Sequence, residues 1–308
     1  MAANPLAHRT TEGIIRMNRY APIAAILACA LATPAMAQQP DGDDPLPAGP
    51  PETVFDGDYL SVGIGAAYSP TYSGSDDYSI NVLPILQASF KGVRLNPRPG
   101  GVALDFIPDP DEGLGFSAGP MIRLRSDRTD VEDIDDDVVA LYGELDRAWE
   151  VGASLGVSKP RLLNPYDSLS VNVDATWDVA GAHNGMVVSP SVTYFTPLSQ
   201  ATAASLSLST SFVDDDFADY YYTVPTIATF APDADLLPAF QATGGMQSYG
   251  VNLFLAHDLS GDVTDGGFSV VGIGGWSKLV GDASDTPFTS IRGNDDQFFA
   301  AVGLGFTF

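Results

Sequence analysis

From about residue 58 onward, apolar residues alternate with polar or small ones at a period of two. The segment 168–180 shows the pattern clearly, with Leu169, Val171 and Val173 set between Ser170, Asn172 and Asp174. Because successive side chains of a β-strand point to opposite faces, this pattern predicts strands with one apolar and one polar face. Turn-forming residues separate the segments. The sequence predicts strands at 58–68, 79–90, 113–125, 145–158, 168–180, 186–195, 202–212, 247–257, 267–279 and 297–308.

Two more strands are predicted between residues 91 and 107. Val93 and Leu95 precede the turn-forming sequence Asn-Pro-Arg-Pro-Gly-Gly at 96–101, and Val102 and Leu104 follow it, which is typical of a hairpin. The total is then about twelve strands, an even number that returns both ends of a barrel to one side. We expect the long loops outside, at 69–78, 126–144, 181–185, 213–246 and 280–296, and the shorter ones inside, at 108–112, 159–167, 196–201 and 258–266.

The segment 297–308 has a strongly apolar face that includes Val302, Leu304, Phe306 and Phe308. A strand of this kind needs a neighbour on each side or a lipid environment. Its aromatic end resembles the closing strand of bacterial outer-membrane barrels, where the terminal aromatic is the signal for the barrel assembly machinery, so Phe306 and Phe308 are the candidate assembly signal. A soluble β-sandwich would show the same period. Strand length and the aromatic end favour a transmembrane antiparallel β-barrel, closed because lipid tolerates no open sheet edge.

The first 37 residues read as a cleaved signal peptide. Arg16 and Arg19 precede an apolar run that ends on Ala35-Met36-Ala37, a typical cleavage site, and Met17 is placed like the true start. Cys29, the only cysteine, leaves with this segment, and a lipoprotein attachment site there is the less favoured alternative. Residues 38–57 are rich in Pro, Asp and Gly and predict a flexible periplasmic lead-in. The barrel is expected to occupy 58–308.

The chain is strongly acidic, with 14 basic and 39 acidic residues. This balance excludes nucleic acid as a partner. The acidic residues gather between strands, at 130–137, 214–216 and 282–296, which predicts solvated outer loops. Carboxylates of this kind could hold Ca²⁺ or bridge cations to lipopolysaccharide, but the runs lack the glycine and the spaced ligands of a calcium loop. We therefore predict no metal site and no cofactor.

Further motifs lie at 68–78, 83–86, 119–120, 181–185, 220–225 and 279–308. Together they resemble the MipA/OmpV family of outer-membrane proteins. The resemblance runs from about 58 to 308, with two departures: Asn184 follows His183 where the family has a small residue, and the 126–144 loop is richer in Asp. It implies a barrel in the Gram-negative outer membrane, in contact with lipid and lipopolysaccharide. One family member is regarded as a scaffold between a lytic murein transglycosylase and a murein synthase, and others are described as porin-like or antigenic.

A scaffold would need a docking surface on its periplasmic side. The turn from Lys159 to Tyr166 is the inner turn that combines basic, apolar and aromatic side chains, so Lys159, Arg161 and Tyr166 are the candidate partner residues. The competing interpretation is an ordinary turn with side chains that anchor it at the membrane interface.

A diffusion channel is the alternative function. If the apolar faces of the strands point to lipid, then Arg123, Arg125, Glu150, Asp174 and Asp178 point into the lumen. Opposed charges inside a barrel can line a selective pore. They can equally form a salt-bridged plug that stiffens a closed wall.

An enzyme is the least favoured class. Beyond the signal peptide the histidines are His183, in an outer loop, and His257, at an inner strand end, so we expect them on opposite sides of the membrane. No G-x-S-x-G motif surrounds a serine, and neither histidine has a nucleophile and an orienting acid nearby in sequence. We therefore predict a protein without catalytic activity.

Overall fold

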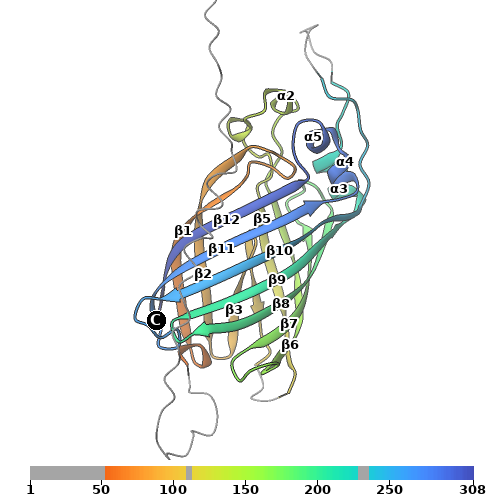
Figure 1. The fold of residues 1–308 in the computed structure, drawn as a ribbon. Helices are drawn as coiled ribbons and strands as arrows, with labels where there is room; N and C mark the ends of the chain where they lie inside the picture. The colour runs from red at the N-terminus through yellow and green to blue at the C-terminus, as the bar shows by residue number, and fades with distance from the viewer. Residues whose placement is uncertain (1–52, 109–112, 228–235) are drawn as a thin grey trace, which may run out of the picture. The chain divides into compact units, whose positions relative to one another are not determined.

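Twelve antiparallel strands form a closed barrel in which each strand pairs with its sequence neighbours and β1 pairs with β12 (Figure 1). The computed structural model describes residues 53–108, 113–227 and 236–308, so the predicted signal peptide and most of the predicted lead-in lie outside the described residues. The strands are β1 (Tyr59–Pro70), β2 (Tyr78–Phe90), β3 (Val93–Arg98), β4 (Gly101–Asp105), β5 (Gly115–Arg125), β6 (Ala148–Pro160), β7 (Ser168–Asp178), β8 (Met186–Ser199), β9 (Thr202–Val213), β10 (Gly245–Asp258), β11 (Gly267–Leu279) and β12 (Asp296–Thr307).

The twelve-strand antiparallel barrel predicted from the alternating pattern is confirmed. The hairpin predicted between 91 and 107 is β3 and β4, although its turn is tighter than the 96–101 segment suggested, because Arg98 and Gly101 are already ladder partners. The inner loop predicted at 196–201 is also shorter, since β8 continues to Ser199 and pairs there with Thr202. Among the described residues, no helix has the length and apolar character needed to cross a membrane.

The barrel closes between its first and last strands, where two glycine pairs face the lumen. Gly63 lies opposite Gly305, and Gly65 lies opposite Gly303. A Cβ atom on Gly63 would come within 2.5 Å of the carbonyl oxygen of Leu304, so the two strands approach too closely there for a side chain. A hydrogen bond between the hydroxyls of Ser61 and Thr307, 2.8 Å long, joins the same two strands at the end where the C-terminus lies.

Apolar side chains cover the outer face of the wall. Leu155, Leu208 and Leu304 are all more than half exposed, as expected for residues whose neighbour is lipid rather than protein. The inner face carries small and polar residues, including the serine series Ser205, Ser207 and Ser209 on β9. The pleat of each strand therefore separates a lipid face from a lumen face.

The two ends of the barrel differ in their connections. Short turns and the C-terminus lie at one end, and the long connections with their helices lie at the other (Figure 1). At the end with short turns, the 3-10 helix η2 (Val54–Asp56) precedes β1, and the backbone N–H of Val54 donates to the carbonyl of Thr264. The last residues of the predicted lead-in are thus attached to the β10–β11 turn, and ordered structure begins earlier than Asp58.

The acidic runs were predicted as solvated loops, but parts of them are helix starts. The Asp136 side chain accepts hydrogen bonds from the first turn of α2 (Asp137–Ala140), and Asp214 does so for α3 (Asp215–Tyr222). A carboxylate at this position satisfies N–H groups that have no partner inside the helix. The connection between β11 and β12 contains α4 (Asp282–Asp285) and α5 (Pro287–Ser290), and a 3-10 helix, η3 (Val131–Asp133), precedes α2.

We use the term outer cap for the described parts of the connections 71–77, 126–147, 179–185, 214–244 and 280–295. These segments pack against one another across the end of the barrel. One apolar cluster centres on Phe217, Tyr221 and Tyr222 of α3, and a second contains Tyr72, Val139 and Phe288 from three different connections. The outer end of the barrel is therefore covered by a packed layer.

Candidate functional site

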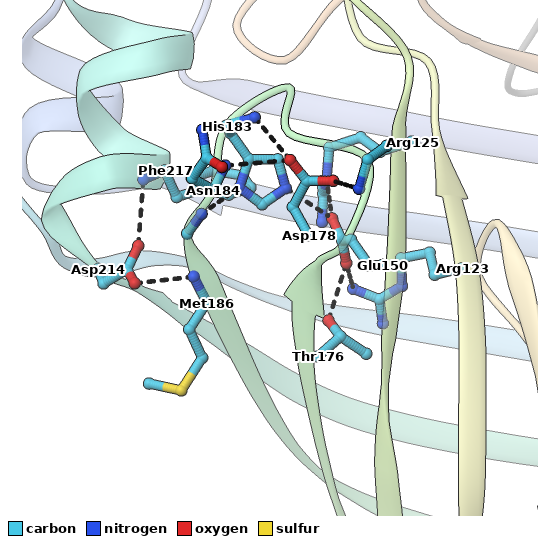
Figure 2. Close-up of polar contacts among 12 residues, drawn as sticks. Arg123, Arg125, Glu150, Thr176, Asp178, His183, Asn184, Met186, Asp214 and Phe217 are labelled. Carbon is cyan, nitrogen blue, oxygen red and sulfur yellow. Dashed lines mark hydrogen bonds and ion pairs between the residues drawn. The ribbon is translucent and has the colours of Figure 1, made fainter.

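The lumen charges meet directly beneath the outer cap, around Glu150 on β6 (Figure 2). The Glu150 side chain has no exposed surface. Its Oε1 accepts a hydrogen bond of 2.6 Å from Nε of Arg125, and its Oε2 accepts one of 2.8 Å from the hydroxyl of Thr176. Arg123, the ladder partner of Glu150, places Nη1 3.6 Å from Oε2. One carboxylate thus faces two guanidinium groups, an arrangement that requires every member to be paired.

His183 connects this cluster to the outer cap. Its Nδ1 accepts a hydrogen bond of 3.0 Å from the backbone N–H of Gly185, which assigns the proton of the neutral ring to Nε2. Nε2 lies 3.4 Å from Oε1 of Glu150, and the ring packs edge-on against Phe217 of α3 with centroids 5.0 Å apart. The loop 179–185 therefore holds the lumen cluster and the cap together.

Asp178 acts on the backbone rather than on another charge. Its Oδ2 accepts hydrogen bonds from the backbone N–H groups of His183 and Asn184. Asn184 has a φ of 55°, a left-handed conformation that a larger or β-branched residue would adopt at a cost. Asn184 thus sits at a left-handed turn, a conformation that Asn adopts more readily than most residues, and Asp178 stabilises that turn.

The remaining lumen charges also occur in pairs. Asp174 on β7 accepts a hydrogen bond of 2.9 Å from Nε of Arg98 on β3, across the lumen. Asp105 on β4 pairs with Arg94 on β3 at 2.6 Å. The sequence reasoning named Asp174 but missed Arg98, Arg94 and Asp105, because the short β3–β4 hairpin had no clear alternation. The available signal was the spacing of Arg94 and Arg98, which puts both on one face of a strand.

Buried charge continues into the outer cap. The guanidinium of Arg128 donates to the carbonyl of Tyr221 and lies 4.3 Å from the centre of the Phe288 ring. Burial lowers the pKa of Arg128, and burial raises the pKa of the neighbouring Asp127 carboxyl against the opposing effect of Arg128. These groups join three outer connections in one network.

The two histidines lie at opposite ends of the barrel. His257 lies at the end with the short turns, where Nδ1 is 2.9 Å from the hydroxyl of Thr202 in an exposed position. His183 is buried, and its ring nitrogens face Gly185 and Glu150. Among the hydrogen bonds of the described residues, neither histidine joins a hydroxyl nucleophile on one nitrogen to an acid on the other.

The turn between β6 and β7, which the sequence predicts to be periplasmic, is built around Asp167, whose side chain is buried. Asp167 Oδ1 accepts a hydrogen bond of 2.7 Å from the N–H of Leu162, and Oδ2 accepts one of 3.0 Å from Leu163 and one of 2.8 Å from the Tyr194 hydroxyl. Burial raises the pKa of Asp167, but these hydrogen bonds outweigh burial and hold it below its ordinary value. The turn is therefore internally fixed.

The candidate partner residues occupy two different positions at this turn. Arg161 and Tyr166 are exposed on the turn itself, and Leu163 between them is 78% exposed. Lys159 lies on β6, on the same face as Val157 and Leu155, so it projects from the lipid side at the membrane boundary. Arg161 has a φ of 55°, and its N–H bonds the carbonyl of Asp167.

The candidate assembly residues lie at the periplasmic end of β12. Phe306 packs between Phe268 of β11 and Phe308, at centroid distances of 4.7 and 4.6 Å. The N–H of Phe308 donates to the carbonyl of Leu60 on β1, and the Phe308 side chain is largely exposed. These aromatic rings form a ladder on the outer face beside the seam between the first and last strands.

Comparison with known proteins gives one family. The family model described as MltA-interacting protein MipA matches residues 62–308. No curated protein matches the chain. The crystal structure of the COG4313 outer membrane channel from Pseudomonas putida F1 is similar at 15% identity, with 87% of this chain and 100% of that chain covered and a TM-score of 0.40. A substituted variant of OccD1 (OprD) is similar at 11% identity, with coverages of 84% and 97% and a TM-score of 0.27. The family match spans most of the barrel, and this chain, an outer-membrane β-barrel, belongs to the MipA family.

Proposed function

We propose that this barrel is a scaffolding protein of the Gram-negative outer membrane, which binds a lytic murein transglycosylase and a murein synthase at its periplasmic end. The observation that carries the proposal is the turn 161–167, where Asp167 fixes the backbone from within while Leu163 and Tyr166 remain exposed. A turn that is ordered before binding loses little conformational entropy when a partner docks.

The chemistry of the turn suits a protein partner. Arg161 and Tyr166 are residue types that often dominate interface energies, and Leu163 adds an apolar contact of 78% exposed surface. On a protein with a net charge of −25, a basic group at the periplasmic end attracts the acidic surface of a partner that the rest of the molecule repels. The printed family description, MltA-interacting protein, supports a murein hydrolase as that partner.

The state of the lumen also supports a structural role. Glu150 is paired with Arg125, and Asp174 with Arg98, so the charges that could have lined a selective pore stabilise the wall instead. The outer cap packs across the outer end. A stiff, covered barrel suits an anchor for other proteins better than it suits free diffusion along the barrel axis.

A porin-like channel for small solutes is the second candidate. It is favoured by the small hydroxyl side chains that face the lumen on β9, Ser205, Ser207, Ser209 and Ser211, which leave space for water. This function requires the outer cap to move, because in the packed state Phe217, Tyr221 and Tyr222 are all buried.

The test compares two periplasmic turns. Replacement of Lys159, Arg161 and Tyr166 by Ala is expected to weaken co-purification with a lytic transglycosylase or a murein synthase while the barrel keeps its heat-modifiable gel mobility. The matched control replaces Phe90 and Lys91, an exposed aromatic and basic pair at the β2–β3 turn, and should leave capture unchanged.

The outcomes separate the two functions. Should the wild-type protein capture no murein enzyme yet give stable conductance steps in planar bilayers, the scaffold is excluded and the channel replaces it. If capture persists in the triple variant, docking occurs at another surface of the periplasmic end.

A further inference from the structure

The barrel wall is incomplete between β2 and β3. The two strands share three ladder pairs near the periplasmic end, Phe90 with Val93, Ser89 with Arg94, and Ala88 with Leu95. On its other side β2 pairs with β1 along its whole length, from Ser89 to Tyr78. Within the described residues, the segment Ser79–Gln87 of β2 has no ladder partner on β3. A long strand edge is thus left open toward the outer half of the membrane.

Pro97 and the early end of β3 at Arg98 account for the end of the ladder. Lys91 and Gly92 form a two-residue turn with positive φ at both positions, so Phe90 and Val93 are a hydrogen-bonded pair. Backbone groups alternate in direction along a strand, and therefore Pro84 on β2 and Pro97 on β3 both direct their nitrogens into the gap. Neither nitrogen carries a hydrogen. Continued in the same register, Pro84 would face Pro99 in the β3–β4 turn, so β3 ends before it can cover the rest of β2.

Side chains are unusually exposed along the same unpaired segment of β2. Ile80 and Val82 on the outer face of β2 are each 74% exposed, compared with 58% for Leu208 and 56% for Leu304 in strands that have neighbours on both sides. Asn81, which points inward between them, is exposed as well. Both faces of this part of β2 are therefore exposed.

The two borders of the gap have different chemistry. On the β2 side, Leu83 and Ile85 point inward, and the Ile85 side chain reaches over the glycine seam to within 3.1 Å of the position a Cβ of Gly303 would take. Val271 and Ile273 continue this apolar surface on β11. On the β3 side, Asn96 and Arg98 lie on the inward face, and Arg98 reaches Asp174.

One polar atom across the lumen from this gap, on β7, lacks a partner. Asp174 is 8% exposed, and while its Oδ2 accepts from Arg98, its Oδ1 has no hydrogen-bond partner among the described residues. A buried carboxylate oxygen without a donor is costly. An incoming group with an O–H or N–H would satisfy it once the side chains that cover the oxygen move aside.

We propose that the gap between β2 and β3 is a lateral portal for single-chain amphiphiles with a hydroxyl or amino headgroup, such as monoacylglycerols. The acyl chain enters from the bilayer past Ile80 and Val82 and lies along Leu83 and Ile85. The headgroup donates a hydrogen bond to Oδ1 of Asp174 beside Arg98. Because the outer cap covers the axial opening, the portal gives the lumen access to the membrane without movement of the cap. This activity is independent of docking at the periplasmic turn.

The test uses two neighbouring positions on β11. The barrel has no cysteine of its own, so a bimane fluorophore can be attached at Val271→Cys, which faces the lumen, or at Val270→Cys, which faces lipid. The protein is placed in nanodiscs with a monoacylglycerol that carries a nitroxide on its acyl chain. Quenching at both positions is expected, because the chain reaches the lumen as well as the outer surface.

Closing the portal should separate the two signals. The changes Leu83→Trp and Ile85→Trp each fill the inner border without altering the strand edges. Each is expected to abolish quenching at position 271 and to leave it intact at position 270. Asp174→Asn should weaken binding of the monoacylglycerol, and a nitroxide-labelled diacyl phospholipid should not quench position 271. Absence of lumen quenching in the open protein, or lumen quenching that survives both closures, would overturn the portal.

Discussion

The Nε atom of Arg125 lies 2.6 Å from Oε1 of Glu150, in a part of the lumen where the carboxylate has no exposed surface. Arg123 approaches the same carboxylate, and His183 approaches it from the loop above. One side chain therefore joins the barrel wall to the outer cap.

Glu150→Gln should strongly destabilise the barrel. The change removes the charge that compensates two buried guanidinium groups, and breaking a buried ion pair from one side costs about 3–5 kcal/mol. A lower midpoint of urea unfolding in micelles would show it. Asp135→Asn, at an exposed position in the outer cap, is the control and should leave the midpoint unchanged. An unchanged midpoint for Glu150→Gln would mean that the cluster does not hold the wall.

The periplasmic turn should lose its order in acid. The folded-state pKa of Asp167 is depressed, so its stabilising contribution is present above the ordinary carboxyl pKa and is lost as the pH falls through the folded value. The amide resonances of Leu162 and Leu163 are expected to shift in that acidic range, with a midpoint below the value for a free aspartate. Asp167→Asn should remove this titration, and a midpoint at or above the ordinary value would contradict the assigned hydrogen bonds.

Deletion of Phe308 should prevent assembly. The residue contributes the last backbone bond to Leu60 and the end of the aromatic ladder beside the closing seam. We expect the deleted protein to be degraded in the periplasm, measured as loss from outer-membrane fractions. Leu259→Ala, which removes another exposed apolar side chain at the same end, should assemble normally. Normal amounts of the Phe308 deletion, with heat-modifiable mobility, would contradict the assembly role.

The orientation of the barrel can be tested with single cysteines. Asp135→Cys and Asp215→Cys lie in the outer cap and should react with an impermeant maleimide on intact cells. Asn164→Cys lies in the periplasmic turn and should react only after the envelope is opened. The reversed pattern would place the cap in the periplasm and remove the basis for docking at residues 161–167.

The strands could be predicted because each carries its own evidence. Leu169, Val171 and Val173 alternate with polar residues whatever their neighbours are, and the resulting strand at 168–180 matches β7 closely. The β3–β4 hairpin gave a weaker signal, because Pro97 interrupts it. These two strands were predicted because a barrel needs an even number of strands to return both chain ends to one side.

The outer cap could not be predicted in the same way. Tyr72, Val139 and Phe288 come from three connections, and only the folded barrel brings them together in one cluster. The acidic residues that marked these segments as loops serve in part as helix caps, as Asp136 and Asp214 show. Partners such as Arg98 for Asp174 likewise depend on which strands face each other across the lumen.

The pairing of β1 with β12 determines when the barrel can close during assembly. The hydroxyls of Ser61 and Thr307 bond across a separation of 246 residues, so the contact that completes the wall is also among the most distant in the chain. Contacts of this kind form late, because a large loop must close before they yield any stabilisation. Until then both edge strands present unpaired backbone groups to the periplasm. A chaperone that shields β1 would therefore be needed for the whole interval between export of the first strand and arrival of the last.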